Sequence, residues 1–194
     1  MNQKIKYCLL LVALFCSGNI EAQEEYPDKL IAKNDSLTQF CDTSKLVKEI
    51  SFILKSFRGA KLVSRAEYNC RVYKNRILKI SCESRTLIGK TGSISMNWVR
   101  QTVYYNYQVP IFVGQADNGR YYNDNVKWEE ASIDDELNCN PWEASLNYYR
   151  GKLIWYFSNG HGISETDEWN PSTWGMEIAY KLRKAVQTKY PNLK

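Results

Sequence analysis

The only histidine of the chain, His161, stands between two glycines in a polar segment that also contains Glu165, Asp167 and Glu168. An imidazole close to a carboxylate can act as a general base, so these four residues are the candidates for hydrolytic chemistry. A single histidine excludes catalytic zinc sites that are built on two or three histidines. No Gly-x-Ser-x-Gly sequence marks a nucleophilic serine. Exposed loop residues without a catalytic task are the simpler interpretation of this segment.

Aromatic residues are the second chemically informative group, with 14 tyrosines, 6 tryptophans and 6 phenylalanines. Several tyrosines are adjacent in the sequence, and neighbouring residues of a β-strand point to opposite faces of its sheet. Some of these rings must therefore face away from the core, where they can line a ligand cavity, a glycan platform or a protein interface. The predicted binding residues are Tyr105, Tyr107, Tyr122, Trp128 and Trp169. Plain packing of the same rings is the alternative.

Four cysteines lie beyond the first 22 residues, and an even number in an oxidising compartment predicts two disulfides. Cys70 and Cys82 fall on the same face of two consecutive predicted strands at a similar level, which predicts that they form one pair. Cys41 and Cys139 then form the other pair. No Cys-x-x-Cys sequence and no calcium-binding pattern occurs, so the sequence predicts no metal site and no cofactor.

Residues 1–22 have the order of a secretory signal peptide. Two lysines precede an apolar run over 7–16, and Ala22 supplies the small residue at the expected cleavage site. A lipoprotein anchored through Cys16 is the rival interpretation, but the bulky Phe15 before it disfavours lipid attachment. No segment approaches the roughly 20 apolar residues that span a bilayer. We therefore expect a secreted or periplasmic protein without stable membrane insertion.

The rest of the chain is long enough for one ordinary domain with a substantial core. Residues 23–36 are polar and lack periodicity, so we expect a flexible lead-in followed by a single globular domain over 37–194. Asn34-Asp35-Ser36 is a glycosylation sequon within that lead-in, relevant in a eukaryotic host. The net charge of +5 is modest and no nucleic-acid-binding motif occurs, so nucleic acid is not an expected partner.

Two amphipathic helices are expected, one before and one after a region of strands. The first covers 43–57, because apolar residues recur there at helical spacing from Leu46 to Phe57. The second begins at Asn170-Pro171, a capping residue followed by a first-turn proline, and ends near Lys189.

Between the two helices the sequence predicts antiparallel strands, because polar and apolar residues alternate over most of it. These strands are expected over 62–72, 78–88, 93–113, 120–130, 145–149 and 152–158. The alternation changes phase near Trp98-Val99, which requires a bulge or a break. Turns are expected at Lys74-Asn75-Arg76, at Asp117-Asn118-Gly119 and at Arg150-Gly151.

This order of elements predicts an α+β fold with about seven antiparallel strands, in a curved sheet or a partly closed barrel, between an amphipathic helix and a C-terminal helix. The sequence holds no recognisable nucleophile motif, metal cluster or phosphate-binding loop, and this favours a binding protein over an enzyme. We therefore expect an exported soluble protein that binds a small ligand, a glycan or a protein partner, including an inhibitor or immunity-type role. A small secreted hydrolase that uses His161 with a nearby carboxylate is the alternative.

Overall fold

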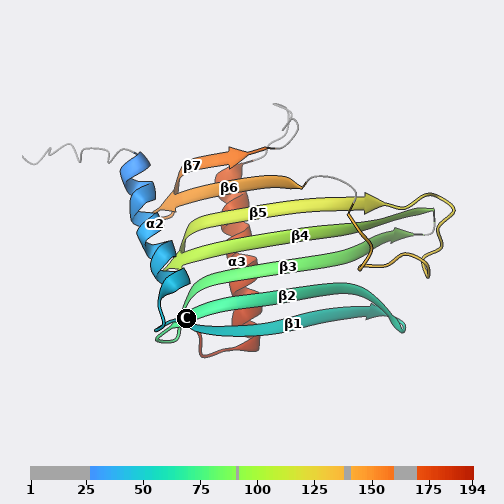
Figure 1. The fold of residues 1–194 in the computed structure, drawn as a ribbon, viewed down its shortest axis with the longest axis horizontal. Helices are drawn as coiled ribbons and strands as arrows, with labels where there is room; N and C mark the ends of the chain where they lie inside the picture. Colours follow the sequence, from blue (N-terminus) through green and yellow to red (C-terminus); the bar gives the residue numbers. More distant parts are fainter. Residues whose placement is uncertain (1–26, 91, 138–140, 160–169) are drawn as a thin grey trace, which may run out of the picture.

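The computed structural model describes residues 27–90, 92–137, 141–159 and 170–194. Its elements, in chain order, are α2 (Pro27–Thr43), β1 (Lys48–Arg58), β2 (Lys61–Tyr73), β3 (Arg76–Lys90), β4 (Ser93–Asn106), β5 (Val109–Tyr121), β6 (Trp142–Tyr149), β7 (Lys152–Ser158) and α3 (Pro171–Lys189). The seven strands form one curved antiparallel sheet in chain order, and β1 and β7 are its edges (Figure 1). The predicted α+β fold is confirmed in its curved-sheet form, because the sheet is not closed.

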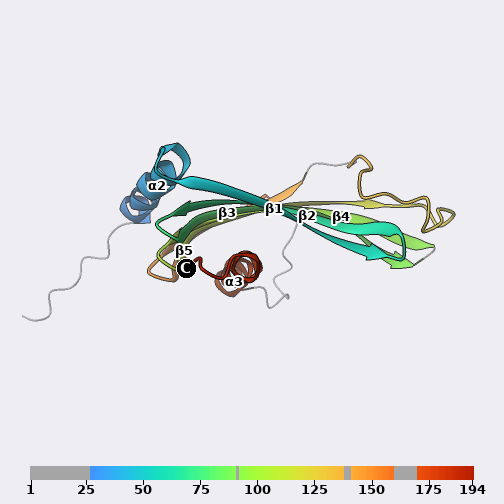
Figure 2. The same ribbon diagram turned by 90° about the horizontal axis from the view of Figure 1, so that it is seen from below.

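Helix α3 covers one face of the sheet and buries Ile178, Leu182 and Val186 in the main core (Figure 2). Gly175 lets this helix approach β6 closely, because a Cβ atom there would lie 2.1 Å from the Tyr148 hydroxyl. The helix begins as predicted, since the Asn170 side chain accepts a hydrogen bond from the Thr173 amide at 3.2 Å. Its predicted end near Lys189 is also confirmed.

The opposite face of the sheet is covered at its two ends by different elements. We define the near end as the end with the β2–β3, β4–β5 and β6–β7 turns, and the far end as the end with the β1–β2 and β3–β4 turns. Helix α2 lies at the near end, on the side of the sheet away from α3 (Figure 2). At the far end the loop 122–137 buries Ala131 and Ile133 against Leu87, Ile94 and Met96, which gives the molecule a second, smaller core.

The position predicted for the first helix was wrong. Residues 48–58 form β1, and the expected flexible lead-in is helical from Pro27 onward, as α2. An edge strand carries apolar residues on both faces, so Ile50 on the α3 face and the half-exposed Ile53 on the other face imitate helical spacing. Helix α2 was not predicted, because a polar residue, Asn34, lies in the middle of its buried side and interrupts the apolar spacing.

The boundary between β4 and β5 also differs from the prediction. The chain turns at Tyr107-Gln108, where Tyr107 has a φ of 59°, rather than at Asp117-Asn118-Gly119, which lies within β5. The expected strand over 120–130 is loop from Tyr122 onward. The predicted turn at 74–76 is confirmed, because Lys74 and Asn75 have φ values of 49° and 61°. The turn at Arg150-Gly151 and the hairpin that it joins are confirmed as well.

The predicted Cys70–Cys82 disulfide is absent from the structure, where both thiols are free and buried. Strand register explains the difference, because Cys70 pairs with Ile80 and Cys82 pairs with Tyr68, so the two cysteines are diagonal rather than opposite neighbours. Burial raises the pKa of Cys70 to about 12 and that of Cys82 to about 11. Cys41 is also free and buried, and Cys139, its predicted partner, lies outside the described residues.

The side chain of Asn34, the sequon asparagine, is buried and fixes α2 to the sheet. Its Nδ2 atom donates hydrogen bonds to Ile111 O at 3.1 Å and to Tyr148 O at 2.9 Å. A glycan on this nitrogen would have to replace both bonds and occupy the core, so the folded chain cannot carry one there. No described helix is long and apolar enough to cross a membrane.

Candidate functional site

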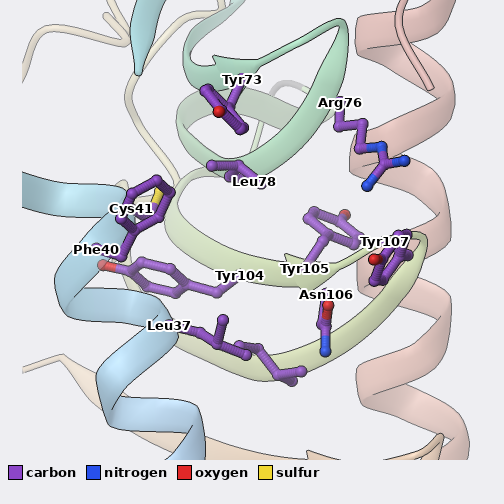
Figure 3. A pocket seen from close by; sticks show the side chains of 11 residues that line it. Leu37, Phe40, Cys41, Tyr73, Arg76, Leu78, Tyr104, Tyr105, Asn106 and Tyr107 are labelled. Atoms are coloured by element: carbon purple, nitrogen blue, oxygen red, sulfur yellow. The ribbon is translucent and has the colours of Figure 1, made fainter. Parts of the chain in front are cut away.

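A cleft of about 190 Å³ lies at the near end, between α2 and the sheet (Figure 3). Helix α2 contributes Leu37, Phe40 and Cys41 to its wall. Helical geometry brings residues three and four positions apart onto one side, so these three side chains face the same space. Phe40 also packs edge-on against Tyr73 of β2, with 6.0 Å between the ring centres, and this contact helps to close the cleft on that side.

The sheet side of the cleft is formed by two bulges. Residue pairing between β2 and β3 passes from Lys79 to Ile77 and leaves out Leu78, and pairing between β4 and β5 passes from Phe112 to Pro110 and leaves out Ile111. An extra residue in one strand disrupts the ladder locally and bends the strand. Leu78 and Ile111 both line the cleft, so the same irregularities that bend the sheet form its apolar floor.

Arg76 and Tyr107 form the rim of the cleft. The Arg76 guanidinium lies 4.5 Å from the centre of the Tyr107 ring, in the position of a cation–π contact. Tyr107 is 65% exposed and is held by the turn between β4 and β5. Within the described part of the chain, no ion pair joins Arg76 to a carboxylate. The rim therefore offers a positive charge and an exposed ring beside an apolar interior.

Asp42, Lys79 and Tyr104 form a polar network beside the cleft. Lys79 Nζ donates to Asp42 Oδ1 at 2.9 Å, and the Tyr104 hydroxyl donates to Asp42 Oδ2 at 2.6 Å. Burial alone would raise the pKa of Asp42, but the bonds from Tyr104 and Lys79 outweigh it and lower that pKa. Burial likewise opposes the charge on Lys79, yet its bonds to Tyr104 and Asp42 raise its pKa. Both groups are therefore held in their charged forms, and the network joins α2 to β3 and β4.

Tyr105 connects the cleft to α3. Its ring is 4% exposed and lines the cleft, while its hydroxyl donates to Ala179 O of α3 at 2.7 Å. Burial raises the pKa of this hydroxyl, so it remains a protonated donor. The prediction named Tyr105 and Tyr107 as binding residues from sequence alone, and the structure brings both to one cleft.

Two other predicted binding residues, Tyr122 and Trp128, lie at the far end. The Tyr122 hydroxyl is 2.7 Å from both Ser132 O and Asp135 Oδ2, which ties the loop together. Trp128 lies beneath the guanidinium of Arg58, 4.9 Å from its ring centre. Its Nε1 is buried and has no hydrogen-bond partner among the described residues. These contacts account for both rings as parts of the loop's packing.

An open groove of about 490 Å³ lies between the β1–β2 turn and the far-end loop. Glu129, Glu130 and Asp134 line it on the loop side, and Lys61 and Leu62 line it on the sheet side. This groove is larger than the near-end cleft, but it is more open, and none of the described residues that line it is aromatic. The near-end cleft is therefore the better candidate for a small ligand.

The remaining predicted site residues lie outside the part of the chain that the structure describes; they are His161, Glu165, Asp167, Glu168 and Trp169. Their catalytic or binding roles stay predictions. Across residues 27–159 and 170–194, apart from the gaps at 91 and 138–140, no group of three His, Cys, Asp or Glu side chains is arranged to hold a metal ion.

Sequence reasoning missed Asp42, Lys79 and Arg76, as well as the wall that α2 supplies. One pattern in the sequence could have indicated the wall that α2 supplies. Leu30, Asn34, Leu37 and Cys41 are spaced by four, three and four residues, the interval of one helix face. An asparagine inside such a stripe indicates a buried side chain that bonds to the backbone of another element. No signal in the sequence pairs Asp42 with Lys79, because their contact depends on where α2 crosses the sheet.

In comparisons with known proteins, no family model, no curated protein and no solved structure matches the chain.

Proposed function

We propose that this chain is an exported binding protein that holds a small ligand in the near-end cleft. The observation that supports this most directly is the partly enclosed, mostly apolar cleft under α2, to which Phe40, Tyr105 and Tyr107 contribute aromatic rings. An apolar cavity of about 150 Å³ in another protein is large enough for benzene. A volume of about 190 Å³ thus suits one aromatic ring or a short aliphatic chain.

The rim favours a ligand that is negatively charged at one end. Arg76 can donate two hydrogen bonds to a carboxylate, and no described acidic side chain already pairs with it. Asp42, an acidic residue of α2, is engaged by Lys79 and Tyr104 and does not compete. The proposed ligand class is therefore small carboxylates with an apolar body.

Binding can be tested by NMR titration of the protein as purified from the cells that produce it. Phenylacetate is the ligand, and phenylacetamide is its neutral counterpart. We expect phenylacetate to shift resonances around Leu78 and Ile111. Arg76→Gln should weaken binding of the acid more than binding of the amide, because only the acid uses the guanidinium charge. Native mass spectrometry of the same material would show any ligand that the protein carries from its own culture.

Leu37→Trp places a large ring in the cleft and should abolish the shifts. Leu46→Trp is the matched control, because Leu46 is 67% exposed and is not part of the cleft. Shifts that survive Leu37→Trp, or shifts that cluster at the far end, would contradict the proposal. The hydrolase alternative stays a prediction from His161, which lies outside the described residues.

A further inference from the structure

Strand β1 is an edge of the sheet with an apolar and unpaired outer side. It pairs only with β2 among the described elements, and it runs over 11 residues without a proline. Ile53, Leu54 and Phe57 are 48%, 44% and 59% exposed. A long edge strand with exposed apolar residues is a template for pairing with another strand, and proteins usually block such an edge with charged residues.

The symmetry of a strand pair restricts how β1 could meet a second copy of itself. A twofold axis perpendicular to the sheet pairs the two copies antiparallel and continues each face of one sheet into the same face of the other. Residues on the same face must then stand opposite each other. The axis therefore lies level with one residue of β1, which stands opposite its own copy, and not level with the peptide bond between two residues. Ser51, Phe52 and Ile53 are the central choices.

Only the register centred on Phe52 matches the charges. It places Glu49 opposite Lys55 of the second copy and, by symmetry, Lys55 opposite Glu49. A register centred on Ser51 places Lys48 opposite Leu54. A register centred on Ile53 places Lys48 opposite Arg58, and like charges directly opposite each other are destabilising.

The surroundings of Lys55 fit the same register. Within its own sheet Lys55 pairs with Arg65, a residue of like charge. Neither Lys55 nor Glu49 belongs to an ion pair in the described part of the chain. Glu49 already stands opposite Arg71 of β2, whereas Lys55 gains an opposite charge only from a second copy, so the lysine that should block this edge becomes part of a specific contact.

The α3 face of β1 offers matching apolar contacts. Phe52 stacks on Tyr68 with 4.7 Å between parallel ring centres. The same register brings the two Phe52 rings side by side and places Ile50 opposite Leu54. Aromatic and aliphatic pairs of this kind stabilise neighbouring strands. We propose that two copies of this chain associate through β1, in the register centred on Phe52, to form one continuous sheet.

Exchanging the charges of Lys55 and Glu49 tests this pairing. The mass of the particle is measured by sedimentation over a series of concentrations, on the protein as purified from the cells that produce it. The wild type should dimerise. Lys55→Glu and Glu49→Lys each place like charges opposite each other at two symmetric positions, so each should weaken dimerisation about tenfold or more. Mixed together, the two variants should form a heterodimer, because all four facing charges are then complementary.

Lys48→Glu is the matched control, since it changes the net charge equally but lies opposite Ser56 in this register. It should weaken dimerisation less than Lys55→Glu, and circular dichroism should show each variant folded. A wild type that stays monomeric, equal effects of Lys48→Glu and Lys55→Glu, or no heterodimer on mixing would overturn the proposal. Oligomers that keep growing with concentration would overturn it too, because they indicate head-to-tail pairing of β1 with the other edge.

Discussion

The near and far ends of the sheet are built from the same long strands, but their two faces are covered differently. At the near end α2 lies at the tips of the strands on one side of the sheet, and α3 crosses the other side closer to the middle of the strands (Figures 1 and 2). At the far end the strands extend past α3, and the loop 122–137 covers only the opposite face. A partly enclosed cleft forms at the near end and a more open groove at the far end. The end of the sheet that lies closer to both helices therefore holds the smaller and less open site.

The residues at each end reflect this difference. On the α3 side beyond the helix, the strands carry small polar residues such as Ser64 and Thr86, whose hydroxyls are hydrogen-bonded at 2.9 Å. These residues tolerate water and do not require a covering element. At the near end the corresponding positions are Ile80 and Val103, both 0% exposed. The stability of the near end therefore depends on packed apolar area, and that of the far end depends more on local contacts of the loop.

The largest expected effect compares one buried isoleucine at each end. Ile80→Ala removes a fully buried side chain from the main core and should lower the free energy of unfolding by about 2–5 kcal/mol. Ile94→Ala makes the same chemical change at the far end, where Ile94 is 2% exposed. It should change global unfolding less and instead speed hydrogen exchange of the loop 122–137, because that loop can open locally.

Urea denaturation and hydrogen exchange measured by mass spectrometry distinguish these two responses. If Ile94→Ala lowers global stability as much as Ile80→Ala and leaves exchange of the loop unchanged, the two ends form one cooperative unit. The near and far ends would then differ in how they are covered but not in their local stability.

The strands and the last helix could be predicted from sequence because local signals specify them. Alternation identified β2 and β3, and Asn170-Pro171 identified the start of α3. The first helix was misplaced because periodicity alone cannot separate an edge strand with two half-exposed faces from an amphipathic helix. Here the β-branched and aromatic content of β1 was the better indicator, since such residues favour strands.

The candidate site was only partly predictable. Tyrosine pairs indicated that rings must face both sides of the sheet, and Tyr105 and Tyr107 do lie in one cleft. The cleft itself depends on the bulges at Leu78 and Ile111 and on the path of α2, which no local pattern specifies. Strand register also determines whether Cys70 and Cys82 can form a disulfide. A shift of two residues in the pairing of β2 with β3 makes them diagonal neighbours instead of opposite ones.

A smaller effect should follow from loosening α2 at the near end. Asn34→Ala removes the donor that bonds to Ile111 O and Tyr148 O, and leaves two buried carbonyls without it. The expected loss of stability is about 1–3 kcal/mol. Hydrogen exchange should rise in α2 and stay unchanged at the far end. Asp35→Ala is the control, because Asp35 is exposed on the same helix. Increased exchange in the loop 122–137 would show that α2 supports both ends.

The smallest expected effect is the pH dependence of the network that joins α2 to the sheet. Because the pKa of Asp42 is lower in the folded chain than its ordinary value near 3.9, ionised Asp42 stabilises the fold at neutral pH. This contribution is lost as the pH falls through the folded pKa. The raised pKa of Lys79 sets the other limit, because its contribution is lost only in strong alkali. The Asp42 side chain is 37% exposed, so solvent screening keeps the effect below about 1 kcal/mol.

Asp42→Asn tests this network without changing the shape of the side chain. The stability difference between wild type and variant should be largest near pH 7 and should shrink as the pH falls below about 4. Glu177→Gln is the matched control, because its ion pair with Lys181 is 3.4 Å long and both side chains are mostly exposed. That variant should differ little from wild type at any pH. If Asp42→Asn shows the same flat profile, the network does not stabilise the near end, and α2 is held there by Asn34 and apolar packing alone.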